Sequence, residues 1–302
     1  MDKVGVVIVT HNRINKLQKC LSSYETQSFQ PTFLLVVDNA CTDGSSEYLD
    51  DWCQYSQQSV LQKYVIHSSE NLGGAGGFWL GMKHALDKDV DWIWLADDDA
   101  YPQNDCFLNL FNIYGILSSD EREQTAALCA RVNDPDGLSP LHRRQIKKGL
   151  FAVKETCVSM SDYLKQSVSI DIFSFVGTAI KKRAILQTGL PRKDFFIFYD
   201  DTEYSLRIGN RGKILCIPSA VILHDSQENT IVKYSWKNFY MFRNKLFIYK
   251  YIWGRRYYFP EIMKTIYMIL KFYNCTETWH QFFVALRAVK AKKMGIHNDY
   301  LP

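Results

Sequence analysis

Four short apolar segments in the first hundred residues end in polar or acidic side chains, and this alternation limits the fold more than any other feature. The segments are VGVVIVT (4–10), FLLVVDNA (33–40), VLQKYVIH (60–67) and DWIWLADDDA (91–100). Stretches with helical spacing of apolar side chains separate them, as in residues 14–24. Strands that alternate with helices over short connections predict an α/β fold with a parallel, helix-covered sheet.

The carboxyl ends of these predicted strands carry the residues best suited to bind a ligand. Thr10, Asp38 and the three aspartates 97–99 fall at strand ends, and the glycine-rich segment ENLGGAGGFWLG (70–81) follows the third strand. Ligands of open α/β sheets bind at the carboxyl ends of the strands. We therefore expect these residues to meet in one site.

The charge is unevenly distributed along the chain. Residues 233–302 contain thirteen Lys or Arg and three Asp or Glu, a balance of +10. Since the whole chain carries +4, residues 1–232 carry about −6. From residue 234 on, aromatic and basic residues alternate in helix-compatible patterns. We expect a catalytic domain over 1–232 and a basic, aromatic helical region over 233–302 that meets an anionic surface, such as a membrane or nucleic acid. The alternative is that this region is a helical cap on the main domain with a solvated basic face.

The eight cysteines are dispersed and form no C-x-x-C pair, which argues against a zinc ribbon or a redox dithiol. In a chain of 302 residues a disulfide scaffold is not expected, so the pattern favours reduced thiols in the cytoplasm. The N-terminus MDKVGVVIVTHNR does not resemble a signal peptide. No apolar stretch of 18 residues indicates a spanning helix.

The three consecutive aspartates after the fourth strand concentrate like charge, which is costly without compensation. One interpretation is a solvated loop in which Asp99 or a neighbour caps the next helix. The strand-end position favours the other, in which Asp97 and Asp99 bind Mg²⁺ or Mn²⁺ that bridges to a diphosphate. His224 is either a further metal ligand or an ordinary core histidine.

A second acidic cluster follows the aromatic segment FFIFY (195–199), which we interpret as a strand. Asp200 and Asp201 end this segment and open a short helix at about 201–210. One carboxylate among several, partly desolvated, is suited to act as a general base. The alternative is that acids here favour the helix N-terminus electrostatically, which applies most to Glu203. Between the clusters, residues 131–170 are expected to run irregularly over the surface, followed by a pair of strands.

The glycine-rich segment does not fit the known phosphate-binding loops. A G-x-G-x-x-G motif starting at Gly74 requires glycine at position 79, which is Trp79, and no G-K-[ST] follows. We expect the glycines to form a bare wall that a ligand can approach closely, with helix N-terminal N–H groups facing it. A merely flexible turn fits these residues less well. Asp38, in turn, either accepts hydrogen bonds from a ribose or base or caps the turn CTDGSS.

Six segments occur in the order found in a known family: VVIVTHNR, VVDNACTDGS, ENLGGAGGF, WLADDDA, FYDDTEYSLRIGNRG and AVILHD. Over about residues 3–225 the chain resembles the family 2 inverting glycosyltransferases with a GT-A fold, a Rossmann-like mixed sheet that binds nucleotide sugars. The glycine segment, DDDA and DD-x-E-Y are most similar to bacterial galactofuranosyltransferases. Rhamnosyltransferases share the first, second and fifth segments.

The resemblance implies a role for each candidate residue. Thr10 and Asp38 would contact the uridine, and Asp97 and Asp99 would hold the metal and diphosphate, with His224 completing the metal shell. Asp201 would be the base that deprotonates the acceptor, or would share this role with Asp200. The expected nucleotide-sugar pocket also includes Asn71, Gly73, Gly74, Gly76, Gly77 and Asp98.

The implied function is Mn²⁺- or Mg²⁺-dependent transfer of galactofuranose from UDP-galactofuranose to a hydroxyl of a lipid-linked glycan, in synthesis of a surface polysaccharide such as O antigen, capsule or cell wall. The enzyme would act in the cytoplasm, at the inner face of the cell membrane. A rhamnosyl- or other hexosyltransferase is the alternative within the family. A nucleic-acid- or carbohydrate-binding protein without catalysis is the alternative outside it, but an acidic body would repel nucleic acid, so we expect no such partner.

Overall fold

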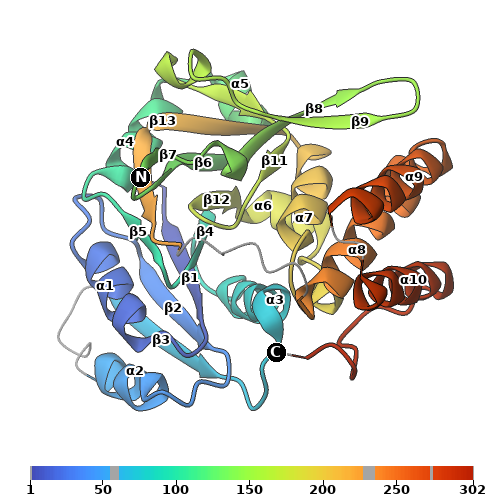
Figure 1. The fold of residues 1–302 in the computed structure, drawn as a ribbon. Coiled ribbons are helices and arrows are strands. Elements are labelled where there is room, and N and C mark those ends of the chain that lie inside the picture. The colour runs from blue at the N-terminus through green and yellow to red at the C-terminus, as the bar shows by residue number, and fades with distance from the viewer. Residues whose placement is uncertain (1, 55–60, 227–234, 273–274, 302) are drawn as a thin grey trace.

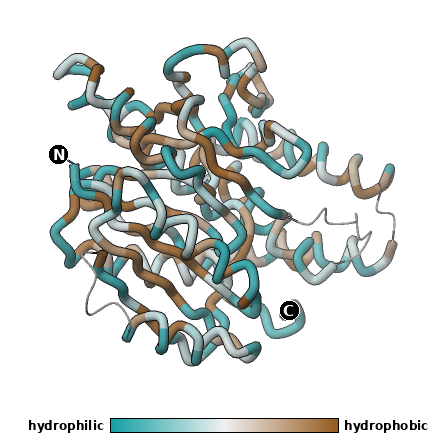
Figure 2. Tube along the Cα trace, turned by 90° about the vertical axis from the view of Figure 1, so that its left-hand side faces the viewer, coloured by the Kyte–Doolittle hydropathy of each residue, from teal (hydrophilic) through white to brown (hydrophobic). Residues whose placement is uncertain are grey.

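The computed structural model describes residues 2–54, 61–226, 235–272 and 275–301. These residues form a mixed sheet of ten strands with helices on both faces, and a group of helices packs beside one end of it (Figure 1). The main path of the sheet runs β10-β13-β6-β12-β4-β1-β2-β3. Figure 2 shows long brown stretches through the interior, as expected for strands that are buried on both faces.

The first half of the sheet is parallel, as predicted. It consists of β1 (Val4–Thr10), β2 (Phe33–Asp38), β3 (Gln62–His67) and β4 (Trp92–Asp97). Thr10 pairs with Asp38 across β1 and β2, and Val9 pairs with Asp97 across β1 and β4. The carboxyl ends of these strands therefore lie at one edge, which brings the predicted site residues together.

The second half of the sheet explains how a distant histidine reaches that edge. Here β12 (Thr178–Lys181) runs antiparallel between β4 and β6 (Thr125–Asp134), and β13 (Lys213–His224) runs parallel to β6. The short β5 (Ala100–Pro102) pairs with the end of β13, which sets His224 opposite Ala100. His224 thus comes next to the three aspartates. The remaining strands of this sheet are β7 (Gly137–Leu138) and β10 (Val168–Ile170).

Helices cover both faces of the sheet. One core joins the sheet to α1 (Ile14–Glu25), α2 (Ser45–Gln54) and α4 (Cys106–Ile116). The core on the other face includes residues of α3 (Gly73–Ala85), α6 (Lys182–Thr188) and α7 (Asp200–Gly209). The short α5 (Ser119–Gln124) begins with a capping box, in which Ser118 and Glu121 satisfy each other's backbone N–H groups. Single 3₁₀ turns are η2 (Pro140–His142), η3 (Asp162–Leu164) and η4 (Lys193–Phe195).

Three sequence predictions about local structure were wrong. The strand expected over 91–100 is two strands, β4 and β5, because the chain turns at Asp98 and Asp99. Residues 131–170 are more regular than expected, since β8 (Arg143–Lys148) and β9 (Val153–Cys157) form a hairpin that pairs with β11 (Ile172–Phe173) in a second sheet. The segment 195–199 is not a strand: Phe196, Phe198 and Tyr199 have positive φ angles, which no strand allows.

The predicted helical region at the C-terminal end is confirmed. It consists of α8 (Lys237–Ile248), a π-helical turn (Tyr249–Trp253), α9 (Arg255–Phe272) and α10 (Thr276–Ala291). Its aromatic core, which includes Phe239, Tyr240 and Phe282, also takes in Phe195 and Phe196 of the catalytic body. The boundary expected between 232 and 233 lies outside the described residues. Among the described helices, none is both long and apolar enough to cross a membrane. All eight cysteines are free thiols, as predicted.

Candidate active site

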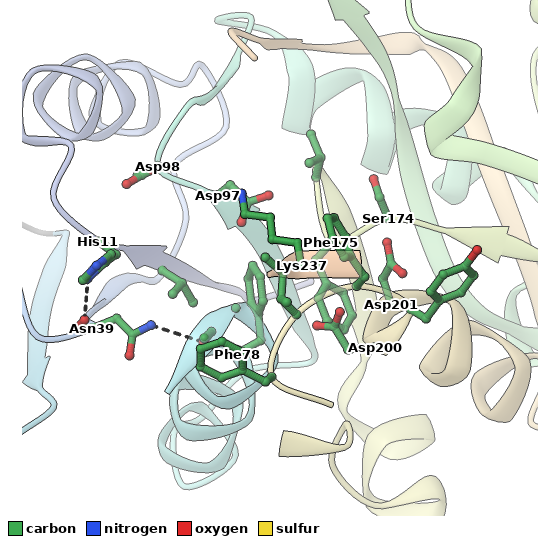
Figure 3. A pocket seen from close by; sticks show the side chains of 18 of the residues that line it. His11, Asn39, Phe78, Asp97, Asp98, Ser174, Phe175, Asp200, Asp201 and Lys237 are labelled. Carbon is green, nitrogen blue, oxygen red and sulfur yellow. Dashed lines mark hydrogen bonds between the residues drawn. The ribbon is translucent and has the colours of Figure 1, made fainter. Parts of the chain in front are cut away.

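A pocket of about 630 Å³ opens at the carboxyl ends of the parallel strands. A cavity of this size is typical of a small-molecule site. Its walls come from the end of β1, the first turn of α3, the end of β4, the turn 196–199 with the start of α7, and the first residues of α8. In Figure 3, Asp97 and Asp98 lie on one side of the view and Asp200 and Asp201 on the other. The two acidic clusters predicted from the sequence therefore face a common space.

The first acidic cluster has the geometry of a metal site. Asp97, Asp99 and His224 each offer a ligand atom, and these atoms lie within 4.8 Å of one another. One oxygen of Asp99, Oδ2, is 2.8 Å from Arg13 Nη1, whereas its buried Oδ1 accepts no hydrogen bond from the described residues. His224 Nε2 lies 3.4 Å from that free oxygen. Carboxylate oxygens and an imidazole nitrogen suit Mn²⁺ or Mg²⁺, so the donor set fits the predicted cation.

The charges around this cluster are compensated unequally. Burial, reinforced by Asp99, raises the pKa of Asp97 to about 7. Burial also opposes ionisation of Asp99, but His224 and Arg13 outweigh it and hold the pKa of Asp99 below its ordinary value. Burial works against the imidazolium of His224 too, yet Asp99 and Asp97 raise its pKa. A cation between the three side chains would relieve the repulsion between Asp97 and Asp99.

Asp98 and Thr10 form the floor next to this cluster. The Thr10 hydroxyl donates to Asp98 Oδ2 at 2.7 Å, and Arg13 Nη1 lies 3.0 Å from Asp98 Oδ1. Both Thr10 and Asp98 are buried and line the pocket. Both therefore lie in the pocket, as the sequence predicted, although both carboxylate oxygens of Asp98 already contact Thr10 or Arg13.

Asp38 lies at the same edge but does not line the pocket. Its carboxylate accepts from the backbone N–H of Cys41 at 2.9 Å and from Ser46 Oγ at 2.6 Å, and it lies 2.7 Å from His67 Nδ1. These contacts fix the turn that leads into α2. The geometry thus favours the capping interpretation that the sequence left open, and it is the next residue, Asn39, that faces the pocket.

A small polar network replaces Asp38 on this wall. His11 Nδ1 donates to Asn39 O at 2.8 Å, and its Nε2 accepts from Asn71 Nδ2 at 3.2 Å. Asn39 Nδ2 in turn donates to Asn71 Oδ1 at 3.1 Å. All three side chains line the pocket. Of these, the sequence predicted only Asn71; His11 and Asn39 directly follow predicted strand-end residues and could have been inferred from that position.

The glycine-rich segment is the first part of helix α3 itself, not a loop before it. Gly73, with φ of +68°, and Gly74 line the pocket, and nothing lies within 4 Å of a Cβ added at Gly74. A Cβ at Gly76 would meet Leu72 at 2.5 Å, and one at Gly77 would meet Val9 at 2.5 Å. Gly73 and Gly74 thus form the expected bare wall, whereas Gly76 and Gly77 are absent from the pocket lining and let α3 pack closely.

The second acidic cluster opens helix α7, and both of its aspartates line the pocket. Burial, together with the charge of Asp201, raises the pKa of Asp200 well above its ordinary value. Burial also raises the pKa of Asp201, although Arg144 opposes the shift. Glu203 instead pairs with Arg207 at 2.8 Å, one helical turn along, and does not line the pocket. Glu203 therefore fits the structural alternative, and the two aspartates fit the role of a base.

Further pocket residues that the sequence prediction missed include Arg144, Lys237 and His142. Arg144 Nη2 donates to Thr202 Oγ1 at 3.0 Å, next to Asp201, and Lys237 extends into the pocket from the first turn of α8 (Figure 3). His142 packs edge-on against His224, with ring centroids 5.0 Å apart, and burial lowers the pKa of His142 to about 3. These residues lie in segments expected to be surface loop or tail, so no strand-end position marked them.

Residues 5–173 match the model of the family described as glycosyl transferase family 2. The chain is 32% identical over 214 residues to "Galactofuranosyltransferase GlfT1" of Mycolicibacterium smegmatis. The alignment covers 70% of this chain and 67% of that protein. It is 23% identical over 254 residues to the N-acetylglucosaminyl-diphospho-decaprenol L-rhamnosyltransferase of Mycobacterium tuberculosis strain H37Rv, covering 76% of this chain and 78% of that one.

A solved structure supports the fold. GalNAc-T7, determined with UDP, GalNAc and Mn²⁺, superposes with a TM-score of 0.65 at 15% identity and covers 96% of this chain and 58% of that one. At this identity the likeness concerns the fold alone. The match to the family model and the identity to GlfT1 favour the catalytic interpretation over a binding protein without activity. The chain therefore belongs to glycosyl transferase family 2 and is a glycosyltransferase with the GT-A fold.

Proposed function

We propose that this protein transfers galactofuranose from UDP-galactofuranose, with inversion at the anomeric carbon, to a hydroxyl of a lipid-linked glycan. The observation that carries the proposal is the arrangement of two different acidic clusters around one pocket. Asp97, Asp99 and His224 form a group whose ligand atoms lie within 4.8 Å of one another, and Asp200 and Asp201 form a group with raised pKa values. A donor diphosphate at the first group would present its sugar to the second.

In the proposed reaction, the acceptor oxygen forms a bond to the anomeric carbon while the bond from that carbon to the UDP oxygen breaks. Asp201 accepts the proton of the acceptor hydroxyl, and the electron pair of the broken bond leaves on UDP. Attack opposite to the leaving group inverts the configuration. The raised pKa makes Asp201 a stronger base than an ordinary aspartate, which favours proton transfer. Asp97, Asp99 and His224 would hold Mn²⁺ or Mg²⁺, which offsets the charge that develops on the diphosphate.

Thr10, Asn39 and Asn71 are the side chains best placed to meet the nucleoside. They lie on the wall formed by β1, the turn after β2 and the start of α3. The bare backbone at Gly73 and Gly74 leaves room for a sugar close to this wall. Asp38 would act indirectly, by fixing the turn that carries Asn39.

Galactofuranose is the donor sugar that the 32% identity to GlfT1 favours. Rhamnose is the second candidate, because the L-rhamnosyltransferase aligns over a larger share of both chains at lower identity. A panel of UDP-galactofuranose, UDP-galactopyranose and dTDP-rhamnose with Mn²⁺, read as nucleoside diphosphate release, separates the candidates. We expect release from UDP-galactofuranose, and EDTA should abolish it. Release from dTDP-rhamnose alone would replace galactofuranose by rhamnose.

The acceptor is proposed to be lipid-linked because one face of helix α9 suits a membrane surface. Phe259, Met263, Tyr267 and Leu270 are each more than half exposed and follow one another at helical spacing. The exposed charged residues of this helix are all basic: Arg255, Arg256, Lys264 and Lys271. An apolar stripe flanked by basic side chains binds anionic interfaces.

Vesicles test this part of the proposal. Sedimentation with vesicles containing anionic lipid should carry the protein down at low salt, and vesicles of neutral lipid should carry down less. The double variant Met263→Ser and Leu270→Ser should reduce sedimentation without changing release of UDP. Equal binding by that variant would remove α9 from the proposal.

A further inference from the structure

The turn that delivers the two aspartates to the pocket has an unusual backbone. Phe196 has φ of 65° and ψ of −63°, and the N–H of Ile197 donates to Phe195 O at 2.8 Å, which closes a γ-turn. Phe198 and Tyr199 also have positive φ angles, of 65° and 63°. Side chains with a Cβ rarely adopt such angles, and strained conformations persist only when the surroundings hold them in place.

A single buried amide on helix α8 holds this turn. Asn244 has no exposed surface, and its Nδ2 lies 2.9 Å from each of three carbonyl oxygens, those of Phe195, Ile197 and Phe198. Its Oδ1 accepts from Arg243 Nε at 2.9 Å. Because a guanidinium can only donate, this bond fixes the amide with Nδ2 towards the turn. Arg243 Nη2 adds a bond to Phe195 O at 3.0 Å.

The other side of the same turn forms part of the pocket. Phe196, Ile197, Phe198 and Tyr199 line it, and Asp200 follows directly. The carbonyl of Phe196 accepts from the N–H of Ala75, in the first turn of α3, at 3.1 Å. The turn therefore connects three parts of the enzyme: the C-terminal helices, the glycine wall and the start of α7.

We infer that Asn244 is a positioning residue, which sets the place of Asp200 and Asp201 by holding the strained turn. This inference rests on the proposed function of the two aspartates. Asn244 does not line the pocket, so it acts through the backbone of 195–199 and not by contact with a substrate. The C-terminal helices are thereby part of the catalytic apparatus, and not only a surface that meets a membrane.

The inference predicts that a change at Asn244 lowers the rate of transfer but leaves the binding of UDP unchanged. In Asn244→Leu the carbonyls of Ile197 and Phe198 lose the Asn244 donor, and Phe195 O keeps Arg243 Nη2, while the side-chain volume is nearly kept. We expect kcat for transfer to fall by about tenfold to a hundredfold, the usual effect of displacing a reacting group by about an ångström. The Kd of UDP with Mn²⁺ should stay unchanged, because Asp97 and Asp98 lie on the side of the pocket away from Asp200 and Asp201 (Figure 3).

Gln27 provides a matched control. It is 2% exposed, and its Nε2 lies near three backbone carbonyl oxygens outside the pocket: those of Ser23 at 3.1 Å, Pro102 at 3.5 Å and Gln103 at 2.7 Å. Gln27→Leu also leaves buried carbonyls without a donor, so both variants should lower the melting temperature, but only Asn244→Leu should lower kcat. Equal losses of kcat in the two variants would overturn the inference, as would a wild-type kcat in Asn244→Leu.

A readout independent of activity separates this inference from the proposed function. Amide hydrogen exchange of peptides covering 194–204 and the first turn of α3 should speed up in Asn244→Leu and remain at the wild-type rate in Gln27→Leu. Unchanged exchange at 194–204 would show that Asn244 does not hold the turn. This result would overturn the inference whichever sugar the enzyme transfers. If Asn244→Leu does not fold, Asn244→Asp, which keeps the shape but cannot donate, should give the same kcat loss and faster exchange; normal values for both would overturn the inference.

Discussion

The two acidic clusters differ in how many basic side chains lie next to their carboxylates. Asp98 and Asp99 are surrounded by cationic partners, since Arg13 lies within 3.0 Å of both and Lys16 lies 3.8 Å from Asp99. In the part of the chain that the structure describes, no ion pair joins Asp200 or Asp201 to a basic side chain. In the first cluster the pKa of Asp99 is lowered, although burial raises that of Asp97 to about 7, whereas in the second cluster the pKa of both members is raised.

This difference indicates a division of labour. A carboxylate that stays ionised and has a free oxygen is suited to hold a cation, as Asp99 Oδ1 is. A carboxylate whose proton affinity is raised by burial is suited to accept a proton from an acceptor hydroxyl. The charge environment thus distinguishes Asp99 from Asp200 and Asp201, which the residue type alone does not.

The largest expected effect comes from removing the first cluster. Asp99→Asn removes a charge from the proposed cation site, so both donor binding and transfer should fail. We expect the transfer rate to fall by about 10³-fold, in the range known for loss of an electrostatic group at a reacting centre. Rates of both proteins are measured at the Mn²⁺ and donor concentrations that saturate the wild-type enzyme. A variant with near-normal transfer would show that the cation, if needed, binds elsewhere.

A similar loss of rate, with a different cause, is expected for the second cluster. Asp201→Asn removes the proposed base and should lower kcat by about 10²-fold or more. The donor KM should change little. Asp200→Asn provides the comparison within the pair: the variant with the greater loss identifies the residue that takes the proton.

A medium effect is expected for Lys237, which enters the pocket from α8 between the two clusters in the view of Figure 3. Its positive charge is placed to stabilise a departing diphosphate, so Lys237→Met should lower kcat by about tenfold, as for loss of one charged contact of about 1.4 kcal/mol. Lys83→Met, the same change on α3 outside the pocket lining, is the control and should have no effect. Equal rates for both variants would show that Lys237 does not stabilise the departing diphosphate.

The smallest effect is a shift of the pH profile. Burial raises the pKa of Asp201 and Arg144 partly counteracts the shift. Arg144→Gln removes this counter-charge, so the pKa should rise further. Because only the ionised carboxylate accepts a proton, activity is lost as the pH falls through this pKa, and the acidic limb of kcat should move to higher pH. Glu155→Gln, which keeps the guanidinium of Arg144 but removes its ion-pair partner, should not move the limb upward.

The strand-end half of the site could be predicted from the sequence because it follows from strand order. Once β1, β2 and β4 are parallel and adjacent, Thr10, Asp38 and Asp97 must meet at one edge. Whether each side chain faces the pocket depends on local hydrogen bonds, which is why Asp38 turned out to hold a turn. Gly76 and Gly77 likewise lie away from the pocket: a Cβ at Gly76 would meet Leu72 and one at Gly77 would meet Val9 of β1.

The other half depends on contacts that strand order does not encode. Arg144 reaches Thr202 only because β8 and β11 pair in a second sheet. The turn before Asp200 was mistaken for a strand, because its aromatic composition is typical of strands, whereas its backbone is set by Asn244 in a helix more than forty residues away. Long-range polar contacts of this kind have no periodic signal in the sequence.

Calorimetric titration of UDP in the presence of Mn²⁺ into Asp99→Asn and Asp201→Asn tests the division of labour most directly. If the first cluster holds the cation and diphosphate and the second only moves a proton, Asp201→Asn binds UDP with the wild-type Kd, and Asp99→Asn shows no Mn²⁺-dependent binding. Loss of binding in Asp201→Asn, or normal Mn²⁺-dependent binding in Asp99→Asn, would contradict it.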